Sequence, residues 1–396
     1  MTVRDRWRSF WQGVSRRWDN MPTWGRIALM VAFLVFLYAL PNRGFYEYLG
    51  IPLGSDYFPF YTTRNDMAAV LFQCAYIILL ALGLNIVVGY AGLLDLGFFG
   101  FFAVGAYTVA TLTSPESKVI TEYNWLESPL PWLVVMPIAI ALSLLAGVLL
   151  GLPVLRLRGD YLAIVTLGFA EMIRIVAQQN EWIFNGDRGI PNIPHPPGSV
   201  GGEPFFGFEF KEYYWLVLTV IILMVFLIRN MYHSRVGRAW VAIREDEDAA
   251  EIMGVNTYKF KIWAFCMGAG IGGLSGALWA SQASFINAST FRLESSILVL
   301  SAVLLGGAGN IGGAILGGFL VIYIPEWLRS IGDVFGLPET VSVGGQDYDV
   351  SATSLRYFFF GIILIVVMIF RPQGLWPNRQ RARELRDREK EAMVGA

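Results

Sequence analysis

The chain has 396 residues, of which 55% are hydrophobic and only 15% charged, with a formal net charge of −1 and a mean hydropathy of +0.51. A soluble domain usually carries about a quarter charged residues, so this composition excludes an ordinary soluble protein. A net charge near zero also excludes an overall field that would attract nucleic acid. The apolar residues fall in long blocks, which predicts an all-α integral membrane protein.

About ten such blocks follow one another, and each predicts a transmembrane helix. The eighth block is the weakest and is compatible with a re-entrant segment. The predicted spans cover residues 24–40, 66–88, 93–113, 131–152, 161–179, 213–229, 262–283, 295–306, 311–328 and 355–370.

Arginine and lysine concentrate in alternate loops, as they do on the cytoplasmic side of membrane proteins. With ten spans, all the basic regions fall on one side, which predicts two cytoplasmic termini. We therefore divide the chain into a basic N-terminal extension (1–23), a transmembrane domain (24–370) and a charged cytoplasmic tail (371–396). The first apolar block is not followed by a small-residue cleavage site, so we interpret it as a span rather than a signal peptide.

Cysteine and histidine are scarce. Cys74 and Cys266 both lie in apolar segments, which favours packing over a disulfide or a ligand pair. His195 and His233 are far apart, so we expect no His-rich metal site and no bound metal.

Glycine follows two patterns. Gly268, Gly272 and Gly276 stand four apart, a spacing that lets two helices approach closely in lipid. The runs 89–92 and 306–313 should instead interrupt helices, because so many glycines weaken a continuous helix. One break in each half suggests an internal repeat and is a pointer to a transport pathway. The glycines that define these breaks are Gly89, Gly92, Gly306 and Gly309.

Few ionisable residues lie within the apolar blocks, and each is a candidate for the translocation path because burying a charge in a membrane is costly. Asp95 either caps the third helix or serves the path. Glu171 and Arg174 are three residues apart, which fits a structural ion pair or a substrate contact. Glu294 precedes the eighth helix, where it is an interfacial residue or a gate.

The most informative polar stretch is 234–256, between the sixth and seventh spans. Residues 239–253 predict one short helix ended by Gly254, with an i,i+4 pair between Arg244 and Asp248. Such a segment fits a membrane-surface helix, a helix that docks into a partner or a plain connector.

Several separate motifs now coincide, and together they are specific. The chain resembles the LivM-type permeases of branched-chain amino-acid ABC importers, in the wider BtuC- and LivH-LivM-like superfamily, from about residue 67 to residue 377. The motifs are GYAGLLDLGFFGFFAVGAY (89–107), LPVLRLRGDYLAIVTLGFAEMIRI (152–175), SRVGRAWVAIREDEDAAEIMGVN (234–256), LLGGAGNIGG (304–313) and RPQGLWP (371–377).

The resemblance implies a bacterial-type inner-membrane protein that assembles with a second, LivH-like permease, two cytoplasmic ATPase subunits and an extracytoplasmic substrate-binding protein. ATP and magnesium would then be used by the partner subunits, and this chain would bind no cofactor. The chain has no GxxxxGK[ST] phosphate loop, so we expect it not to be an enzyme. The resemblance also implies that the stretch after the sixth span couples to the ATPase, chiefly through Arg238, Arg244, Glu245, Asp246, Ala249 and Gly254.

Three rival functions remain open. A urea or short-chain amide ABC permease shares most motifs, and only the LLDLG stretch favours amino acids. An ion-coupled secondary transporter would need a buried carboxylate cluster, which the sequence does not suggest. A membrane enzyme would need convergent catalytic groups at one depth.

The outer loop 184–190 also lacks the double-glycine start of the family pattern, which affects how a binding protein would dock.

Overall fold

The chain forms two compact units, residues 1–55 and 56–396. Of the first unit the structure describes α2 (Thr23–Ala39) and the few residues after it. The predictions for residues 1–22 and for the tail from residue 377 lie outside the described residues, as do residues 156 and 158 of the motif at 152–175. This computed structural model describes residues 23–42, 67–122, 128–155, 157, 159–200, 203–334, 340–343, 346–349, 352–371 and 373–376.

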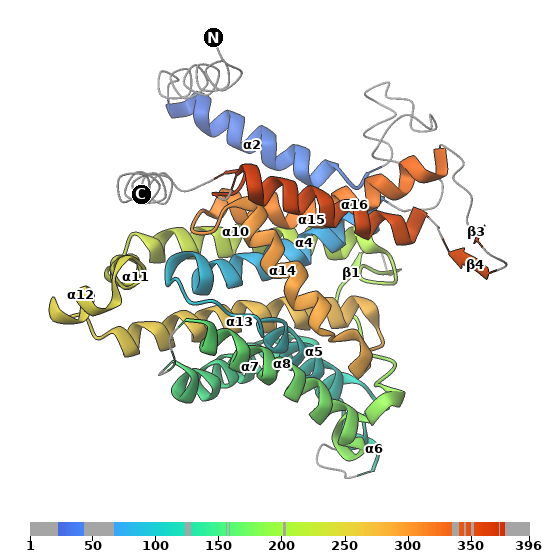
Figure 1. The fold of residues 1–396 in the computed structure, drawn as a ribbon. Coiled ribbons are helices and arrows are strands. Elements are labelled where there is room, and N and C mark those ends of the chain that lie inside the picture. The colour runs from blue at the N-terminus through green and yellow to red at the C-terminus, as the bar shows by residue number, and fades with distance from the viewer. Residues whose placement is uncertain are drawn as a thin grey trace. The chain divides into compact units, whose positions relative to one another are not determined.

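The second unit is built almost wholly of helices (Figure 1). This confirms the predicted all-α fold class, to which the described residues add only two small antiparallel hairpins, β1–β2 and β3–β4. The long helices are α4 (Met67–Leu84), α5 (Phe99–Thr113), α7 (Trp132–Val154), α8 (Asp160–Gln179), α10 (Phe210–Tyr232), α13 (Thr257–Ala283), α14 (Leu293–Gly306), α15 (Ile311–Val334) and α16 (Ala352–Phe370). The shorter elements are η1 (Asn85–Tyr90), α6 (Lys118–Thr121), α9 (Glu181–Phe184), η2 (Gly186–Arg188), β1 (Ser199–Val200), β2 (Glu203–Pro204), α11 (Arg235–Glu245), α12 (Glu247–Ile252), η3 (Ala288–Thr290), β3 (Thr340–Val343) and β4 (Gln346–Asp349).

The lengths and compositions of these helices suit a membrane protein. Among the described residues, six helical stretches are long and apolar enough to cross a membrane, and three shorter helices are also apolar. Each of the ten predicted blocks contains a helix, although several boundaries differ. The six are Met67–Tyr90, Trp132–Val154, Tyr161–Gln179, Phe210–Tyr232, Thr257–Ala283 and Ala288–Gly306.

The third predicted span is wrong at its start. Residues 93–98 are not helical, and α5 begins only at Phe99. Two glycines explain the difference. Gly92 has a positive φ of 73°, which ends the preceding helix. Gly97 lies so close to the backbone of Thr166 that any side chain there would overlap it. The extended segment 93–98 therefore packs against α8 before α5 begins.

The eighth predicted block, where a re-entrant segment was an alternative, forms the 14-residue helix α14. At 1.5 Å per residue it is about 21 Å long, shorter than the roughly 30 Å of a hydrocarbon core. The 3-10 turn η3 precedes it, and the two together make the 19-residue apolar stretch that ends at Gly306.

Helix α13 packs closely against its neighbours on two faces. A side chain at Gly268 would overlap Val87, and one at Gly276 would overlap the backbone of Phe102 on α5. On another face, Gly273 leaves room for Ser143 of α7. The close approach predicted from the Gly268–Gly272–Gly276 spacing is present: a Cβ at Gly268 or Gly276 would overlap its neighbour, and one at Gly272 would lie 3.3 Å from Cβ of Phe101.

The two cysteines are free, as the sequence predicts. Cys74 is buried on α4, with its thiol 3.8 Å from the carbonyl oxygen of Phe319 on α15. Cys266 lies 3.8 Å from the carbonyl oxygen of Leu144 on α7. Both side chains therefore serve packing between helices.

Candidate functional site

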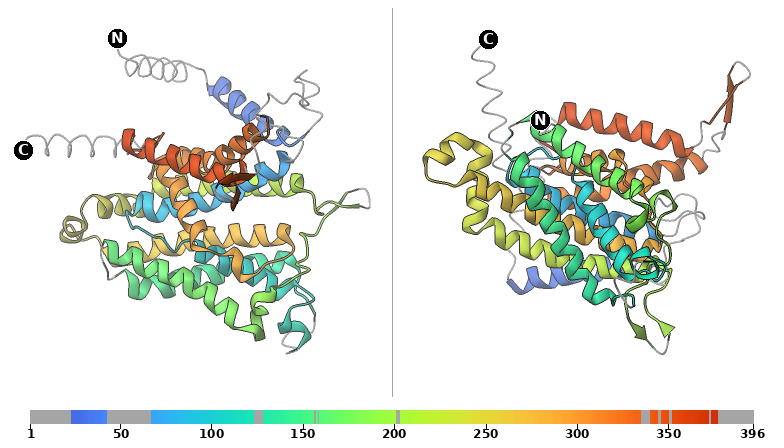
Figure 2. Two further views of the ribbon diagram at one scale, coloured as in Figure 1. Left: turned by 45° about the vertical axis from the view of Figure 1, so that its right-hand side comes forward. Right: turned by 90° about the horizontal axis from the view of Figure 1, so that it is seen from below.

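The stretch after α10 forms an arm that projects beyond the ends of the long helices (Figures 1 and 2). It consists of α11 and α12, so the single helix predicted over residues 239–253 is wrong. The interruption is Asp246, whose backbone is extended (φ −154°, ψ 112°) and whose carboxylate accepts a hydrogen bond from the amide of Ala249 at 3.0 Å. Asp246 thus caps α12, and acidic Glu247 and Asp248 suit the first turn of the new helix.

The end of α12 matches the prediction. Gly254 follows the C-cap with a positive φ of 88°, a conformation that glycine adopts at little cost. The amide of Val255 then donates to the carbonyl of Ala250 at 3.0 Å, closing the turn.

The arm is anchored at its base. Trp240 of α11 is fully buried, and its indole nitrogen donates to the carbonyl of Phe260 on α13 at 2.7 Å. Lys261, with a side chain only 4% exposed, pairs with Glu247 of α12 at 2.5 Å. A buried, paired cation at this position holds α12 in a fixed orientation relative to α13.

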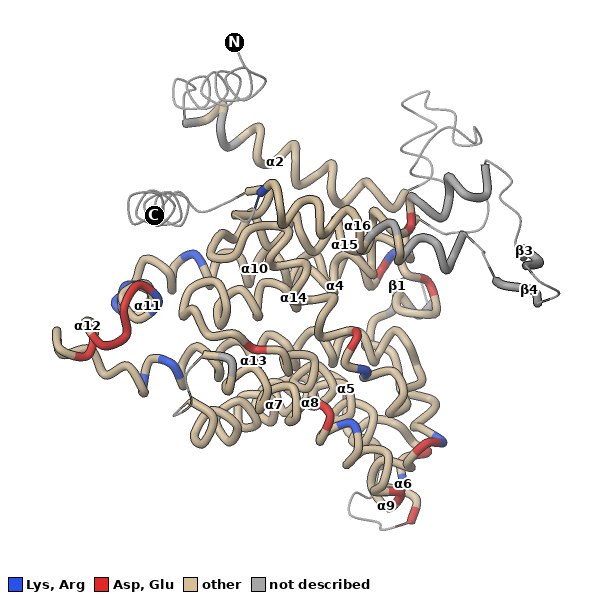
Figure 3. The backbone as a smooth tube through the Cα atoms, in the orientation of Figure 1, with Lys and Arg blue, Asp and Glu red and all other residues tan. Residues whose placement is uncertain are grey.

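The tip of the arm is apolar and uncovered. Ile252 and Met253 are 85% and 84% exposed, although each would gain about 1.5–3 kcal/mol from burial. Charged residues crowd the rest of the arm, in contrast to the long helices (Figure 3). An apolar tip on a charged arm is typical of a docking element.

Most residues predicted for coupling lie on the outer surface of this arm. Arg238 is exposed and donates to the carbonyl of His233 at 3.1 Å. Glu245, Asp246 and Ala249 are exposed as well. Whether any of them touches an ATPase stays a prediction.

Arg244 differs, because it points inward to the first glycine break. Its Nη1 donates to the carbonyl oxygen of Gly89 at 2.7 Å. Its aliphatic stem lies against Gly92, where an added Cβ would be 2.5 Å from Cγ of the arginine. The C-terminal end of α11 is therefore connected to the end of the second predicted span, where the helix of α4 and η1 stops.

The two glycine breaks, far apart in sequence, meet in space. The second predicted span, α4, ends in the π-helix η1, a form often associated with functional sites. The buried side chain of Asn85 on η1 accepts a hydrogen bond from the amide of Gly309 at 2.8 Å. Gly309 has a φ of 85°, and a side chain at Gly89 would overlap both Asn85 and the Gly309 amide. The predicted breaks thus form one junction, which we call the glycine junction (Asn85, Gly89, Gly92, Arg244 and Gly309).

The RPQGLWP motif packs against the second glycine break, at the end of α14. The amide of Trp376 donates to the carbonyl of Gly306 at 2.8 Å, and the amide of Leu375 donates to Leu305 at 2.9 Å. The side chain of Asn310 returns a hydrogen bond to the carbonyl of Trp376 at 3.0 Å. The chain after α16 therefore holds the turn between α14 and α15.

Asp95 is not the N-cap of α5. That position is Phe98, which makes no side-chain cap hydrogen bond. Asp95 is instead buried in the extended segment, where its Oδ1 accepts a hydrogen bond from the amide of Gly97 at 2.8 Å. Its side chain shapes the local turn rather than the helix start, and a role in the translocation path stays a prediction.

The structure contains the ion pair predicted on α8. The Nε of Arg174 donates to Oε1 of Glu171 at 2.9 Å, and Nη1 donates to Gln178 at 3.2 Å. The side chains are 25% and 37% exposed, for Arg174 and Glu171 respectively. Glu294, in the first turn of α14, is exposed and does not line the nearby cavity.

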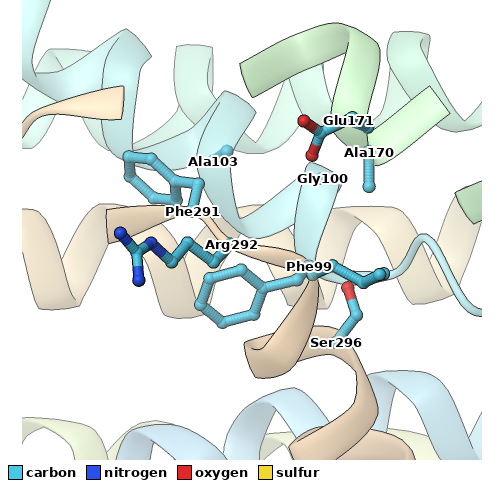
Figure 4. A pocket seen from close by; sticks show the side chains of 9 residues that line it. Phe99, Gly100, Ala103, Ala170, Glu171, Phe291, Arg292 and Ser296 are labelled. Atoms are coloured by element: carbon cyan, nitrogen blue, oxygen red, sulfur yellow. The ribbon is translucent and has the colours of Figure 1, made fainter. Parts of the chain in front are cut away.

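Glu171 lines a small cavity of about 10 Å³, the space of one water molecule, between α5, α8 and the start of α14 (Figure 4). The sequence patterns did not single out Arg292 or Ser296 here, nor Asn85 on η1 and Trp240 on the arm. Arg292 could have been predicted as a candidate residue, because it is a charged residue directly before an apolar block. Asn85 could not, because nothing in the local sequence indicates its contact with a residue 224 positions away. The residues around the cavity are Phe99, Gly100, Ala103, Ala170, Glu171, Phe291, Arg292, Leu293 and Ser296.

A metal centre finds no support in the described part of the chain, where no three His, Cys, Asp or Glu side chains gather in a ligating arrangement. These features define a class: a multi-pass helical membrane protein with an anchored polar arm and two interlocked helix breaks.

Comparison with known proteins gives the family. The profile of the family described as "Branched-chain amino acid transport system / permease component" matches residues 67–368, so the chain belongs to that family. It is a membrane permease subunit of the kind found in ABC transporters.

Individual relatives agree with this family. The chain is 35% identical over 338 residues to the high-affinity branched-chain amino acid transport system permease protein LivM of Escherichia coli, covering 81% of this chain and 72% of that protein. It is 27% identical to a probable LivM of Methanocaldococcus jannaschii over 73% of this chain and 81% of that one. It is 30% identical to the autoinducer 2 import system permease protein LsrC of Yersinia pseudotuberculosis, over 48% of this chain and 53% of that protein. The search of solved structures found no match.

Proposed function

We propose that the chain is the membrane-spanning permease subunit of an ABC importer that carries branched-chain, or other neutral, amino acids into the cytoplasm. The observation that carries this proposal is the likeness to LivM of Escherichia coli, which extends over 81% of the chain and includes the arm and both glycine breaks. Its partners are a second, LivH-like permease, two ATPase subunits that use ATP and magnesium, and an extracytoplasmic binding protein. Both termini face the cytoplasm of a bacterial-type inner membrane.

In this mechanism the ATPase subunits grip the exposed tip of α12. Their closure on ATP pushes the arm, and the anchored base of α11 passes the displacement to the glycine junction through Arg244. The junction joins the cytoplasmic ends of α4 and α14, so its movement alters the opening between the helices. Glycines and a π-helical turn suit such a hinge, because few side chains resist the change.

The alternative substrates are less well supported. The LsrC relative covers about half of this chain, whereas LivM covers most of it. A urea or short-chain amide permease has only the shared motifs in its favour. An ion-coupled secondary transporter would have no use for an arm with an apolar, uncovered tip.

The test is co-purification followed by ATPase assays. The chain, expressed with its neighbouring transport genes, should copurify with ATPase subunits. ATP hydrolysis by the complex should rise with a binding protein loaded with leucine, isoleucine or valine, and not with urea. Stimulation by urea alone, or a chain that copurifies with no ATPase, would contradict the proposal.

A further inference from the structure

Helix α13 is long enough to join the two faces of a membrane. Its 27 residues give a length of about 40 Å, against roughly 30 Å for a hydrocarbon core. It runs from the base of the arm to the opposite end of the long helices (Figure 1). No proline interrupts it, and its glycine-rich middle is enclosed by α5 and α7. A helix supported in this way passes a displacement of one end to the other.

At the end near the arm, α13 is bonded to both helices of the arm. Trp240 of α11 donates to the carbonyl of Phe260. The ammonium group of Lys261 pairs with Glu247 of α12, and Lys261 is only 3% exposed. A buried charge that loses its partner is strongly unfavourable, so this pair resists separation. The arm therefore moves together with α13.

At its other end, α13 is bonded to residues 189–195, which we call the outer strap. The carbonyl oxygen of Ser281, in the last turn of α13, accepts a hydrogen bond from the hydroxyl of Tyr213 at 3.0 Å. The Nδ1 of His195 lies 3.1 Å from the same carbonyl oxygen and 2.6 Å from the Tyr213 hydroxyl. Because a carbonyl only accepts, this nitrogen carries its hydrogen and donates to Ser281.

Backbone hydrogen bonds continue this contact beyond the end of the helix. The amide of Ile193 donates to the carbonyl of Ser284 at 3.1 Å. Ile190 and Ile286 exchange two hydrogen bonds, at 2.8 and 3.2 Å. Both isoleucines of the strap are buried, whereas Asn192 between them is exposed. The strap is therefore fixed to the end of α13 on one side and open to a docking protein on the other.

We propose that α13 carries the docking of the binding protein on the outer strap to the arm, with His195 and Lys261 as positioning residues at its two ends. The inference rests on the proposed import function, which places the strap outside the cell and the arm inside it. A loaded binding protein displaces the strap, and α13 shifts with it. Lys261 then moves α12, through Glu247, into the orientation in which the ATPase subunits hydrolyse ATP.

The first test is ATPase stimulation in the complete transporter, reconstituted in lipid nanodiscs and assayed per assembled complex. Leucine-loaded binding protein stimulates the parent, and the stimulation factor should be about tenfold smaller in Lys261→Met and in His195→Phe. The exchanged pair, Lys261→Glu with Glu247→Lys, should recover part of the loss, because the bond between α12 and α13 is restored. Parent-like stimulation in either single variant would overturn the proposal.

Two matched controls remove the same side-chain types elsewhere. Lys259→Met removes an exposed charge from the first turn of α13. His233→Phe removes the other histidine, whose Nδ1 lies 2.7 Å from the carbonyl oxygen of Arg229 and not on α13. Both controls should be stimulated to within about twofold of the parent. Losses as large as those of the test variants would overturn the assignment to His195 and Lys261.

The double variant, Lys261→Met with His195→Phe, tests whether the two ends belong to one path. If α13 is that path, a second interruption costs nothing more, so the stimulation factor should equal that of the weaker single variant. Two losses that multiply would mean two independent routes and would overturn the proposal.

A distance measurement tests the same link without catalysis. Spin labels at the exposed positions Glu251 and Asn192, in a background without Cys74 and Cys266, report the separation of the arm from the strap. The parent complex should give a narrow distance distribution, and Lys261→Met should broaden it. An equally narrow distribution in Lys261→Met would overturn the rigid link.

The outcomes separate this inference from the import function. A parent complex whose ATPase does not respond to leucine-loaded binding protein would overturn both. A responding parent whose test variants respond equally would overturn the path through α13 while import stands.

Discussion

At the scale of single residues, Arg244 is the most informative. The other residues predicted for coupling are exposed, but the guanidinium of Arg244 reaches the carbonyl oxygen of Gly89, 155 residues earlier in the chain. Gly89 in turn has no space for a side chain, because Asn85 and Gly309 lie against it. Arginine suits this role, since its guanidinium keeps its charge and donates along fixed directions.

We predict that Arg244→Ala separates ATP hydrolysis from transport. A hydrogen bond from a charged donor contributes about 1.5–3 kcal/mol, and its loss frees the glycine junction from the arm. Leucine uptake should fall about tenfold or more, while basal ATPase activity of the assembled complex stays within twofold. Arg235→Ala, at an exposed position on the same helix, is the matched control and should transport normally. Normal uptake in Arg244→Ala would rule out this link.

At the scale of elements, the arm shows which structural features the sequence patterns predict correctly and which they do not. Its position, its helical content and the terminating Gly254 follow from local preferences, and the structure contains all three. The division at Asp246 was missed, because the i,i+4 pattern of Arg244 and Asp248 suggested a continuous helix. The carboxylate of Asp246 accepts a hydrogen bond from the backbone amide of Ala249 and so starts a new helix.

The tip of α12 yields a second prediction. Met253→Asp places a charge where an ATPase groove should be apolar, so copurification of the ATPase subunits should fall about tenfold or more. The thermal stability of the isolated permease should not change, because Met253 is 84% exposed. Glu251→Gln, two residues away and also exposed, is the control and should retain the partner. Full retention of the ATPase by Met253→Asp would contradict docking at this tip.

Helix α13 gives a third prediction, on stability. In Gly276→Ala the new methyl group overlaps the backbone of Phe102, so the helices must separate, at a cost of about 1–3 kcal/mol. Gly168→Ala on α8 is the matched control, because nothing lies within 4 Å of its Cβ and alanine favours the helix. Thermal unfolding in detergent should show a lower midpoint for Gly276→Ala alone. Equal midpoints would show that the interface tolerates side chains.

At the scale of the whole molecule, the apolar blocks were sufficient to predict an all-α membrane protein, and each block holds a helix. The start of the third helix was not predictable from hydropathy, because the contact between Gly97 and Thr166 decides it. The meeting of the two glycine breaks was likewise outside the reach of local patterns. It depends on Asn85 and Gly309, which lie in different halves of the chain.

The central claim is that this permease moves amino acids only when a separate ATPase drives its arm, and uptake by proteoliposomes tests it most directly. With both permeases, the ATPase subunits, ATP inside and the loaded binding protein outside, we expect leucine to accumulate against its gradient. Liposomes that hold the chain alone should show no uptake above protein-free liposomes. Uptake by the chain alone, or accumulation by the complete system without ATP hydrolysis, would contradict the claim.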